Sequence, residues 1–529
     1  MATKQPAATG AGRGVLYIAF AKFYFMFAGL IVQFRLPAIL SHASWGAYSF
    51  VNSLVSPFNN VLVTGTIQSV SKFAAAEPEK ARAVQHAGLR MHVRLGLLIA
   101  IAFIAAAPLV AWGFSDTSKT APLMLGGLII GGNSFYAVFI GTANGTRLFY
   151  KQAGLDITFA TLRTAGLIGM AMAGLGVMGV VGGWVAAVGL IIMVAATWVG
   201  LPRGAERVPV KPMISFFIGV AIYLALFNVL MFVDTWLIKY WTTDYFAEHN
   251  GALKAAADRV VPWASQVSGY HPKPSVLADV QVGYYAAVQN LARLSYQAII
   301  AATFVVFPLV SRSTFTDDRE TTKRYIAVTT RYSLVFAMAI AVVMAANPVD
   351  VLGLVYAPDY AQRGGDALAL LALGNVAFSV FAIAGTILNG AGRSIDAIVT
   401  AAITLALAAA GNFIAIPLVV ESGRTLEVAA GVTGSAMLIG AALTGFMLHK
   451  RLGAFLPIVS IVRIAIATAA ALAVGRVLPL HGKLMTLVEA IAVGATFLVV
   501  LVATRELGKR DLEAIKAVRK KRAPGGGES

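Results

Sequence analysis

The sequence contains no cysteine and few charged residues. Without cysteine, disulfides, thiolate metal sites and cysteine nucleophiles are excluded. The seven histidines are scattered along the chain and match no metal-ligand spacing. Charged residues make up 12% of the chain, against roughly 25% in soluble domains. Such a chain cannot cover itself with a polar surface, so a soluble globular protein is excluded.

The glycine-rich phosphate loop of ATPases is also missing. The two Gly-Lys pairs, Gly482-Lys483 and Gly508-Lys509, lack the upstream glycine that this motif requires. We therefore expect no ATPase on this chain, and no catalytic residue, metal or cofactor.

Long apolar runs are abundant instead. Hydrophobic residues make up 58% of the 529 residues, and runs of about 20 residues, the length that crosses a bilayer, recur along the chain. They predict an all-α polytopic membrane protein with about fourteen transmembrane helices. These helices are predicted at residues 14–34, 44–70, 93–113, 121–144, 155–174, 178–200, 213–238, 283–310, 331–356, 366–390, 395–419, 427–449, 456–479 and 484–504.

Most of the charges are basic. The chain has 42 Lys and Arg residues and 24 acidic residues, a net charge of +18. Most of the basic residues fall on one side of the predicted helices, so the positive-inside rule explains the excess without a nucleic acid partner. We expect a multi-pass protein of the inner (cytoplasmic) membrane with both termini in the cytoplasm. The outer segments would include Lys119 and a loop at residues 239–282, interpreted as a cap or a partner contact.

An internal repeat is visible in motifs that recur in the same order at nearly constant offsets. The pairs are Gly46-Ala-Tyr48 and Gly283-Tyr-Tyr285, Val70-Ser-Lys72 and Val310-Ser-Arg312, Asn144-Gly145 and Asn389-Gly390, and Gly179-Val-Val-Gly182 and Gly431-Val-Thr-Gly434. The order predicts two six-helix bundles of the same orientation. The bundles would be residues 1–212 and 213–450, followed by two accessory helices at 451–504 and a basic cytoplasmic tail at 505–529.

These motifs resemble a known family. Trp45-Gly-Ala-Tyr48, Thr64-Gly-Thr-Ile-Gln-Ser-Val-Ser-Lys-Phe73, Asp234 and Gly283-Tyr-Tyr285 are similar to the polysaccharide flippase branch of the multidrug/oligosaccharidyl-lipid/polysaccharide exporter superfamily. The resemblance implies two bundles around a central cavity, alternating access, and undecaprenyl-diphosphate-linked oligosaccharide as the cargo. Fourteen helices also resemble lipid II flippases, but the first helix carries only Lys22 where an arginine-rich helix would be expected.

Four charged residues are interpreted as lying at mid-membrane depth: Lys22, Arg163, Arg293 and Asp234. A charge at the bilayer centre costs at least about 2.5–3.5 kcal/mol, so such residues usually face a cavity. Three cations suit a diphosphate head group, and we predict that they bind substrate, although Arg163 could instead pair with Asp156. Asp234 could couple transport to H⁺ or Na⁺, or serve as a structural partner for Arg163 or Arg293.

Two equivalent helices of the repeat also carry polar stripes. One stripe consists of Asn52, Ser56, Asn59 and Thr66, and the other of Gln289, Asn290, Arg293 and Gln297. A stripe of this width should face water or a polar cargo, so we predict that Asn52, Asn59, Gln289 and Gln297 line the substrate cavity. The alternative is hydrogen bonding between helices.

The last two helices are interpreted as accessory, without a mid-span charge. By resemblance they offer a lipid-facing groove for the polyprenyl tail, and the tail from Arg505 suits a basic helix on the anionic inner leaflet. The predicted function is therefore flipping of a lipid-linked oligosaccharide for cell-surface polysaccharide synthesis, with membrane lipids and a polymerase or glycosyltransferases as partners. Three alternatives stay open: a lipid II flippase, a cation-coupled multidrug exporter, and a membrane polysaccharide polymerase or ligase.

Overall fold

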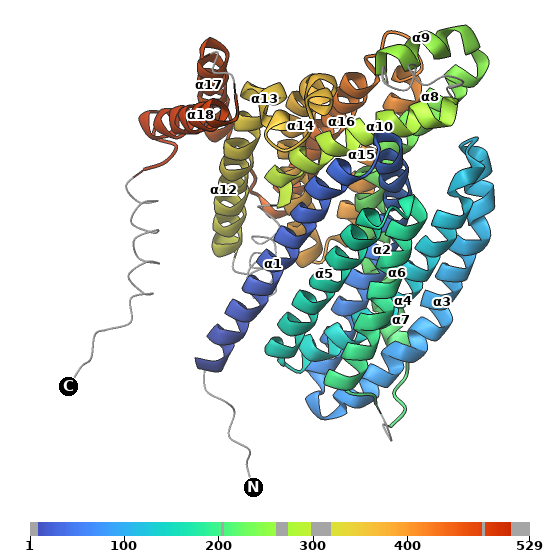
Figure 1. The fold of residues 1–529 in the computed structure, drawn as a ribbon. Helices are drawn as coiled ribbons and strands as arrows, with labels where there is room; N and C mark the ends of the chain where they lie inside the picture. The colour runs from blue at the N-terminus through green and yellow to red at the C-terminus, as the bar shows by residue number, and fades with distance from the viewer. Residues whose placement is uncertain (1–8, 203–205, 261–272, 298–318, 479–481, 509–529) are drawn as a thin grey trace. The chain divides into compact units, whose positions relative to one another are not determined.

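The computed structural model describes residues 9–202, 206–260, 273–297, 319–478 and 482–508, and these contain helices but no strands. Eleven helices within them are long and apolar enough to cross a membrane. The described helices fall in the order of the fourteen predicted segments, which confirms the all-α polytopic class (Figure 1). The predicted tail beyond Gly508 and residues 298–310 of the predicted span 283–310 lie outside the described residues.

Contacts divide the chain into two compact units, residues 1–287 with 401–432, and residues 288–400 with 433–529. The first unit contains α1 (Thr9–Ile39), α2 (His42–Ala76), α3 (Ala81–Gly113), α4 (Thr120–Gly145), α5 (Phe149–Met172), α6 (Gly176–Trp198), α7 (Lys211–Leu230), α8 (Val233–Glu248), α9 (Asn250–Val260) and most of α10 (Pro274–Ala292). Short 3₁₀ turns, η1 (Pro78–Lys80) and η2 (Thr117–Lys119), precede α3 and α4.

The second unit contains α12 (Arg319–Ala346), α13 (Pro348–Gly353), α14 (Pro358–Gly390), α17 (Ile458–Val477) and α18 (Lys483–Ala503). Helices α15 (Ser394–Ala415) and α16 (Thr425–Leu452) contribute residues to both units. The expectation that the accessory helices carry no mid-span charge was wrong, because α18 buries Glu489. A single acid in an otherwise apolar run does not lower the hydropathy of the run enough to be noticed.

The segment 239–282, predicted as one outer loop, is helical for most of its described length. Helix α8 continues through Lys239 to Glu248, α9 follows directly, and α10 already begins at Pro274. The prediction relied on apolar runs, whereas this segment is polar but rich in good helix formers such as Ala and Lys. Residues 261–272 lie outside the described residues.

The predicted helix 213–238 is interrupted. Helix α7 ends at Leu230 and α8 begins at Val233, because Phe232 leaves the helical region with a φ of −134°. Discontinuous membrane helices of this kind often mark ion or substrate sites, since they place helix ends inside the protein.

Helices α2 and α10 cross at two glycines that match in the repeat. A Cβ atom on Gly46 would overlap the carbonyl of Asp279, and one on Gly283 would lie 3.1 Å from the carbonyl oxygen of His42. His42 precedes Gly46 by one helical turn, as Asp279 precedes Gly283, so the contact is reciprocal. The indole Nε1 of Trp45 also donates to the Gly283 carbonyl at 3.1 Å. Matching residues in mutual contact support the repeat, while the bundle boundaries stay predictions.

We expect Gly46→Ala to destabilise the protein by about 1–3 kcal/mol, because the added methyl group has no room at this crossing. The measurement is thermal unfolding of the purified protein in detergent. Gly182→Ala in α6 is the matched control, since a Cβ there meets no atom within 4 Å. Equal unfolding temperatures for Gly46→Ala and the wild type would contradict the close crossing.

Candidate substrate-binding site

Lys22 of α1 forms an ion pair with α5, the helix that packs beside it. Its Nζ atom donates to Oδ2 of Asp156 at 2.8 Å, and the hydroxyls of Tyr24 and Thr161 are hydrogen-bonded one turn further along. The Lys22 side chain is 52% exposed, whereas Asp156 is buried. Asp156 therefore pairs with Lys22 and not with Arg163. An ammonium group has three N–H donors, so Lys22 keeps donors for an anion.

An apolar groove continues from this ion pair between α1 and α5. Its volume is about 460 Å³, and it is lined by Tyr24, Phe27, Ala28, Ile31, Thr161, Thr164, Ala165, Ile168, Gly169 and Met172. The Thr164 hydroxyl is hydrogen-bonded to the Ala28 carbonyl in its wall. A cation thus lies at one end of an apolar groove, an arrangement that suits an amphipathic anion.

Arg163, two turns after Asp156 on α5, lies against two aromatic side chains. Its guanidinium is 4.5 Å from the ring centre of Trp184 in α6, and it interacts with the Tyr48 side chain of α2. Stacking of this kind contributes about 0.5–2 kcal/mol. The Nε–H of Arg163 is buried without a hydrogen-bond partner. The side chain is therefore fixed in orientation and retains unused hydrogen-bonding capacity.

Asp234 lies in the first turn of α8, directly after the break from α7, and is buried. Its Oδ1 accepts from the Thr235 backbone N–H at 2.7 Å, and its Oδ2 accepts from the Tyr285 hydroxyl of α10 at 2.6 Å. The adjacent Trp236 donates from Nε1 to the Ser53 hydroxyl of α2 at 3.0 Å. These donors and the positive end of the α8 dipole hold the carboxylate in place.

The polar stripe of α2 is largely used between helices. Oδ1 of Asn59 accepts from Asn133 of α4 at 2.8 Å, and the Thr66 hydroxyl is 2.7 Å from Nε2 of His92 in α3. For Asn59 and Thr66 the structure thus shows the alternative of interhelical hydrogen bonds. Asn52 is half-buried and accepts from Ser56 within its own helix.

The second stripe begins in the last turn of α10, continues beyond it, and belongs to the other unit. Gln289 is buried, and Asn290 donates to the Tyr356 hydroxyl at 3.3 Å. Arg293 is half-buried beside Tyr296, and Gln297 is half-buried at the last described position of this segment. A joint site of Arg293 with Lys22 therefore remains a prediction.

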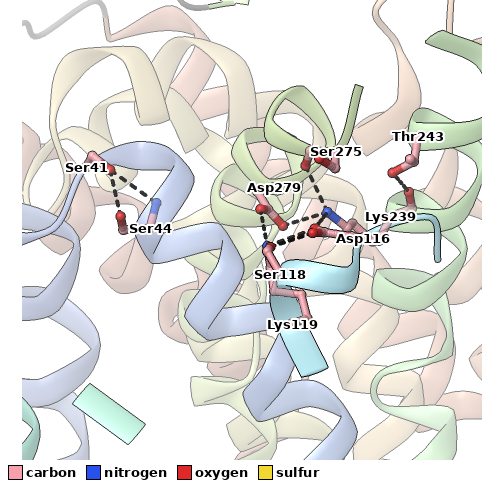
Figure 2. A network of polar contacts seen from close by, with 9 residues as sticks. All are labelled: Ser41, Ser44, Asp116, Ser118, Lys119, Lys239, Thr243, Ser275 and Asp279. Carbon is pink, nitrogen blue, oxygen red and sulfur yellow. Dashed lines mark hydrogen bonds and ion pairs between the residues drawn. The ribbon is translucent and has the colours of Figure 1, made fainter. Parts of the chain in front are cut away.

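A cluster of four buried charges lies where η2, α8 and α10 meet (Figure 2). Lys239 donates to Asp116 and Asp279 at 2.8 Å each, and to the Ser275 carbonyl. Lys119 bonds the same two carboxylates, also at 2.8 Å. Both lysines, predicted in outer segments, are buried. Lys119 lies in the connection between α3 and α4, whereas Lys239 lies within α8. Burial raises the pKa of Asp116, but the two lysines outweigh this and hold that pKa well below its usual range.

Sequence reasoning missed this charge cluster, defined as Asp116, Lys119, Lys239 and Asp279. Only the spacing of Asp116 and Lys119, three residues apart, signalled an ion pair. The other two members lie in the segment predicted as a loop, and no local pattern brings them together. The cluster connects three elements near the Gly46 crossing, since Asp279 belongs to both contacts.

We expect Lys239→Ala to destabilise the protein by about 3–5 kcal/mol, because it leaves two buried carboxylates sharing one cation. Thermal unfolding in detergent measures the change. Lys254→Ala on α9 is the control, since that lysine is exposed. A wild-type unfolding temperature for Lys239→Ala would show that the cluster is not a structural element.

Comparison with known proteins identifies the fold. No family model and no curated protein matches the sequence. Among solved structures, the chain has the fold of the transporters of the multidrug/oligosaccharidyl-lipid/polysaccharide (MOP) superfamily. The all-helical transporter fold that the sequence resemblance implied is thus confirmed.

The solved structures that match this chain include a flippase and several transporters. Lipid II flippase MurJ in an inward closed conformation matches with a TM-score of 0.69 over 93% of this chain and 99% of its own, at 13% identity. An inward-facing multidrug resistance MATE transporter matches at 0.53 over 83% of this chain and 94% of its own, at 12% identity. A MOP superfamily transporter from Pyrococcus furiosus matches at 0.54 over 84% and 95%, at 13% identity.

Proposed function

We propose that this protein flips an undecaprenyl-diphosphate-linked oligosaccharide across the inner membrane by alternating access. The observation that carries the proposal is the fold match to a lipid II flippase along almost the whole of both chains. The matches to MATE transporters and to the Pyrococcus furiosus transporter cover 83–84% of this chain at lower TM-scores. A lipid-linked cargo is therefore favoured over a soluble drug. The cell-surface glycan pathway would supply the partners, a polymerase or glycosyltransferases.

The charges of the candidate site fit an anionic head group. Lys22 has N–H donors left beyond Asp156, and Arg163 has an unpartnered Nε–H. Lys and Arg bind phosphate oxygens through short, charge-assisted hydrogen bonds. A cationic drug would need an uncompensated carboxylate, and Asp156 is already neutralised by Lys22. Arg293, with Asn52, Gln289 and Gln297, would complete the site in our proposal.

The groove between α1 and α5 supports a lipid anion in particular. A diphosphate at Lys22 would place the first isoprene units of the carrier against Phe27, Ile31 and Ile168, which line the groove. Burial of apolar chain there contributes about 0.8 kcal/mol per CH₂ group. We place both termini in the cytoplasm, and α17 and α18 beside the transport path.

We expect Lys22→Ala and Arg163→Ala each to weaken substrate binding roughly ten- to hundredfold, the effect of losing one charge-assisted hydrogen bond. Lys22→Arg and Arg163→Lys should weaken binding less, because they keep the charge. The assay is flipping of the glycolipid in reconstituted proteoliposomes, read by the access of an impermeant lectin, with Lys254→Ala as the control. Wild-type flipping by both alanine variants would refute this site.

A lipid II flippase is the second candidate, favoured by the match to MurJ. Against it, the first helix contributes only one mid-span cation, Lys22. The same proteoliposomes, loaded with lipid II in place of the oligosaccharide lipid, distinguish the two cargoes. If the protein flips lipid II but not the oligosaccharide lipid, lipid II is the cargo and the oligosaccharide assignment is wrong.

Asp234 is proposed as a coupling residue for H⁺ or Na⁺, with a structural role at the α7–α8 break as the alternative. We expect Asp234→Asn, which mimics the protonated carboxyl, to abolish ion-driven flipping while the protein stays folded. Tyr285→Phe is the matched variant, because it removes one donor and leaves the carboxylate. If ion-driven flipping by Asp234→Asn equals that of the wild type, coupling through Asp234 is excluded.

A further inference from the structure

The C-terminal helices α17 and α18 pack on α12 through an apolar core (Figure 1). The buried residues of this core are Val335, Val342, Ala346, Ile464, Ala467, Ala471, Val493, Phe497 and Leu501. The contact is close, since a Cβ on Gly475 of α17 would lie 2.6 Å from the Cβ of Ala346. Two acids, Glu489 in α18 and Glu506 just after it, are buried beside this core.

The two acids have opposite surroundings. Glu506 accepts from Nε of Arg331 at 2.8 Å and lies 3.4 Å from Nη1 of Arg463. Glu489 has no cation within ion-pair distance among the described residues. Its Oε2 accepts from Nδ2 of Asn347 at 2.9 Å, and its Oε1 is buried without a hydrogen-bond partner. Among the described residues, arginines thus neutralise Glu506, whereas no Lys or Arg neutralises Glu489.

Among the described residues, the lining of the site around Glu489 contains no other ionisable group. A small pocket at its carboxyl is lined by Val343, Ala346, Asn347, Val351, Thr486, Ala490 and Val493. The Thr486 hydroxyl donates to the Gly482 carbonyl and is therefore not a donor to the acid.

The helices packed against α18 are α12, α13 and α17. The charged residues near this level are Asp350 of α13, Arg476 of α17 and Lys483 of α18 itself, and none of them lines the pocket. Arg476 and Lys483 are exposed. Within the described ranges, the carboxyl of Glu489 is therefore compensated by one amide and by no charge.

Asn347 makes the site suitable for two protonation states. A side-chain amide can donate from Nδ2 to a carboxylate, or accept at Oδ1 from a carboxylic acid after rotating by a half turn. An ionised carboxylate in apolar surroundings is costly unless it is paired, and binding a proton removes the charge. Within the described part of the chain, Glu489 is the single carboxylate that lines this pocket, which is a poor cage for a metal cation.

We propose that Glu489 and Asn347 form a proton-binding site in the C-terminal helix pair, and that the proton bound there couples transport to the proton gradient. The coupling step rests on the proposed flippase function, whereas the proton site does not. Asn347 lies at the break between α12 and α13, directly before Pro348. A change in the hydrogen bond between Glu489 and Asn347 would thus act at the end of α12. Because α12 and α13 both pack on α14, the change could be passed on to that helix.

The proton site is tested on the purified full-length protein by infrared difference spectroscopy across pH. The wild type should show the C=O band of a protonated carboxyl that is lost in Glu489→Gln, a variant that keeps the size and the acceptor for Asn347. Glu506→Gln is the control and should leave the band in place. If the spectra of the wild type and Glu489→Gln match at every pH, Glu489 binds no proton and the proposal fails.

Coupling is tested in proteoliposomes that carry the oligosaccharide lipid under an imposed pH gradient. For one proton per cycle, each pH unit should change the wild-type leaflet distribution up to tenfold. The Glu489→Gln variant should flip the oligosaccharide lipid, but its leaflet distribution should not change with the pH gradient. The Glu489→Asp variant keeps an acid and should restore the response to the gradient. A purely structural Glu489 predicts a full response in Glu489→Gln, which would overturn the coupling.

These outcomes separate the two proposals. Flipping by the wild type without any response to the gradient overturns the coupling and leaves the flippase function intact. No flipping of any lipid-linked glycan overturns the proposed function, while the infrared band still decides whether Glu489 binds a proton.

Discussion

A charged side chain in a membrane protein must find its compensation inside the protein, because the lipid offers none. This constraint organises the described structure. Lys22 is matched by Asp156, the two lysines of the charge cluster are matched by two aspartates, and Glu506 is matched by arginines. Each pair joins helices that are distant in the sequence, so charge pairing also fixes helix positions.

Against this pattern, the incompletely paired groups are informative. Arg163 keeps a buried Nε–H without a partner, and Glu489 keeps a buried carboxylate oxygen without one. Leaving a buried donor or acceptor without a hydrogen-bond partner costs about 1–3 kcal/mol. In our proposals a ligand supplies the missing partner, an anion in the first case and a proton in the second.

The sequence was sufficient for the apolar helices and insufficient for their pairings. Apolar runs predict the spans because about 20 residues must cross the hydrocarbon, and the embedded cations Lys22 and Arg163 could be named in advance. Their partners could not be named, because Asp156 also lies two helical turns from Arg163 on the same face of α5. Only the packing of α1 on α5 shows that Asp156 pairs with Lys22. Lys239 was misplaced because polar helices such as α8 carry no hydropathy signal. Glu489 was overlooked because one acid hardly changes the average of an apolar helix.

The reciprocal crossing of α2 and α10 constrains how the two halves of the repeat can diverge. Elsewhere a substitution in one half can be accommodated by its own neighbours. At Gly46 and Gly283 the neighbour of each copy is the other copy, so the backbone of one half sets the space allowed to the other. A larger residue in either half would have to move both helices, and with them Asp279 and the lysines that it binds. A substitution at Gly46 or at Gly283 therefore affects the same helix contact.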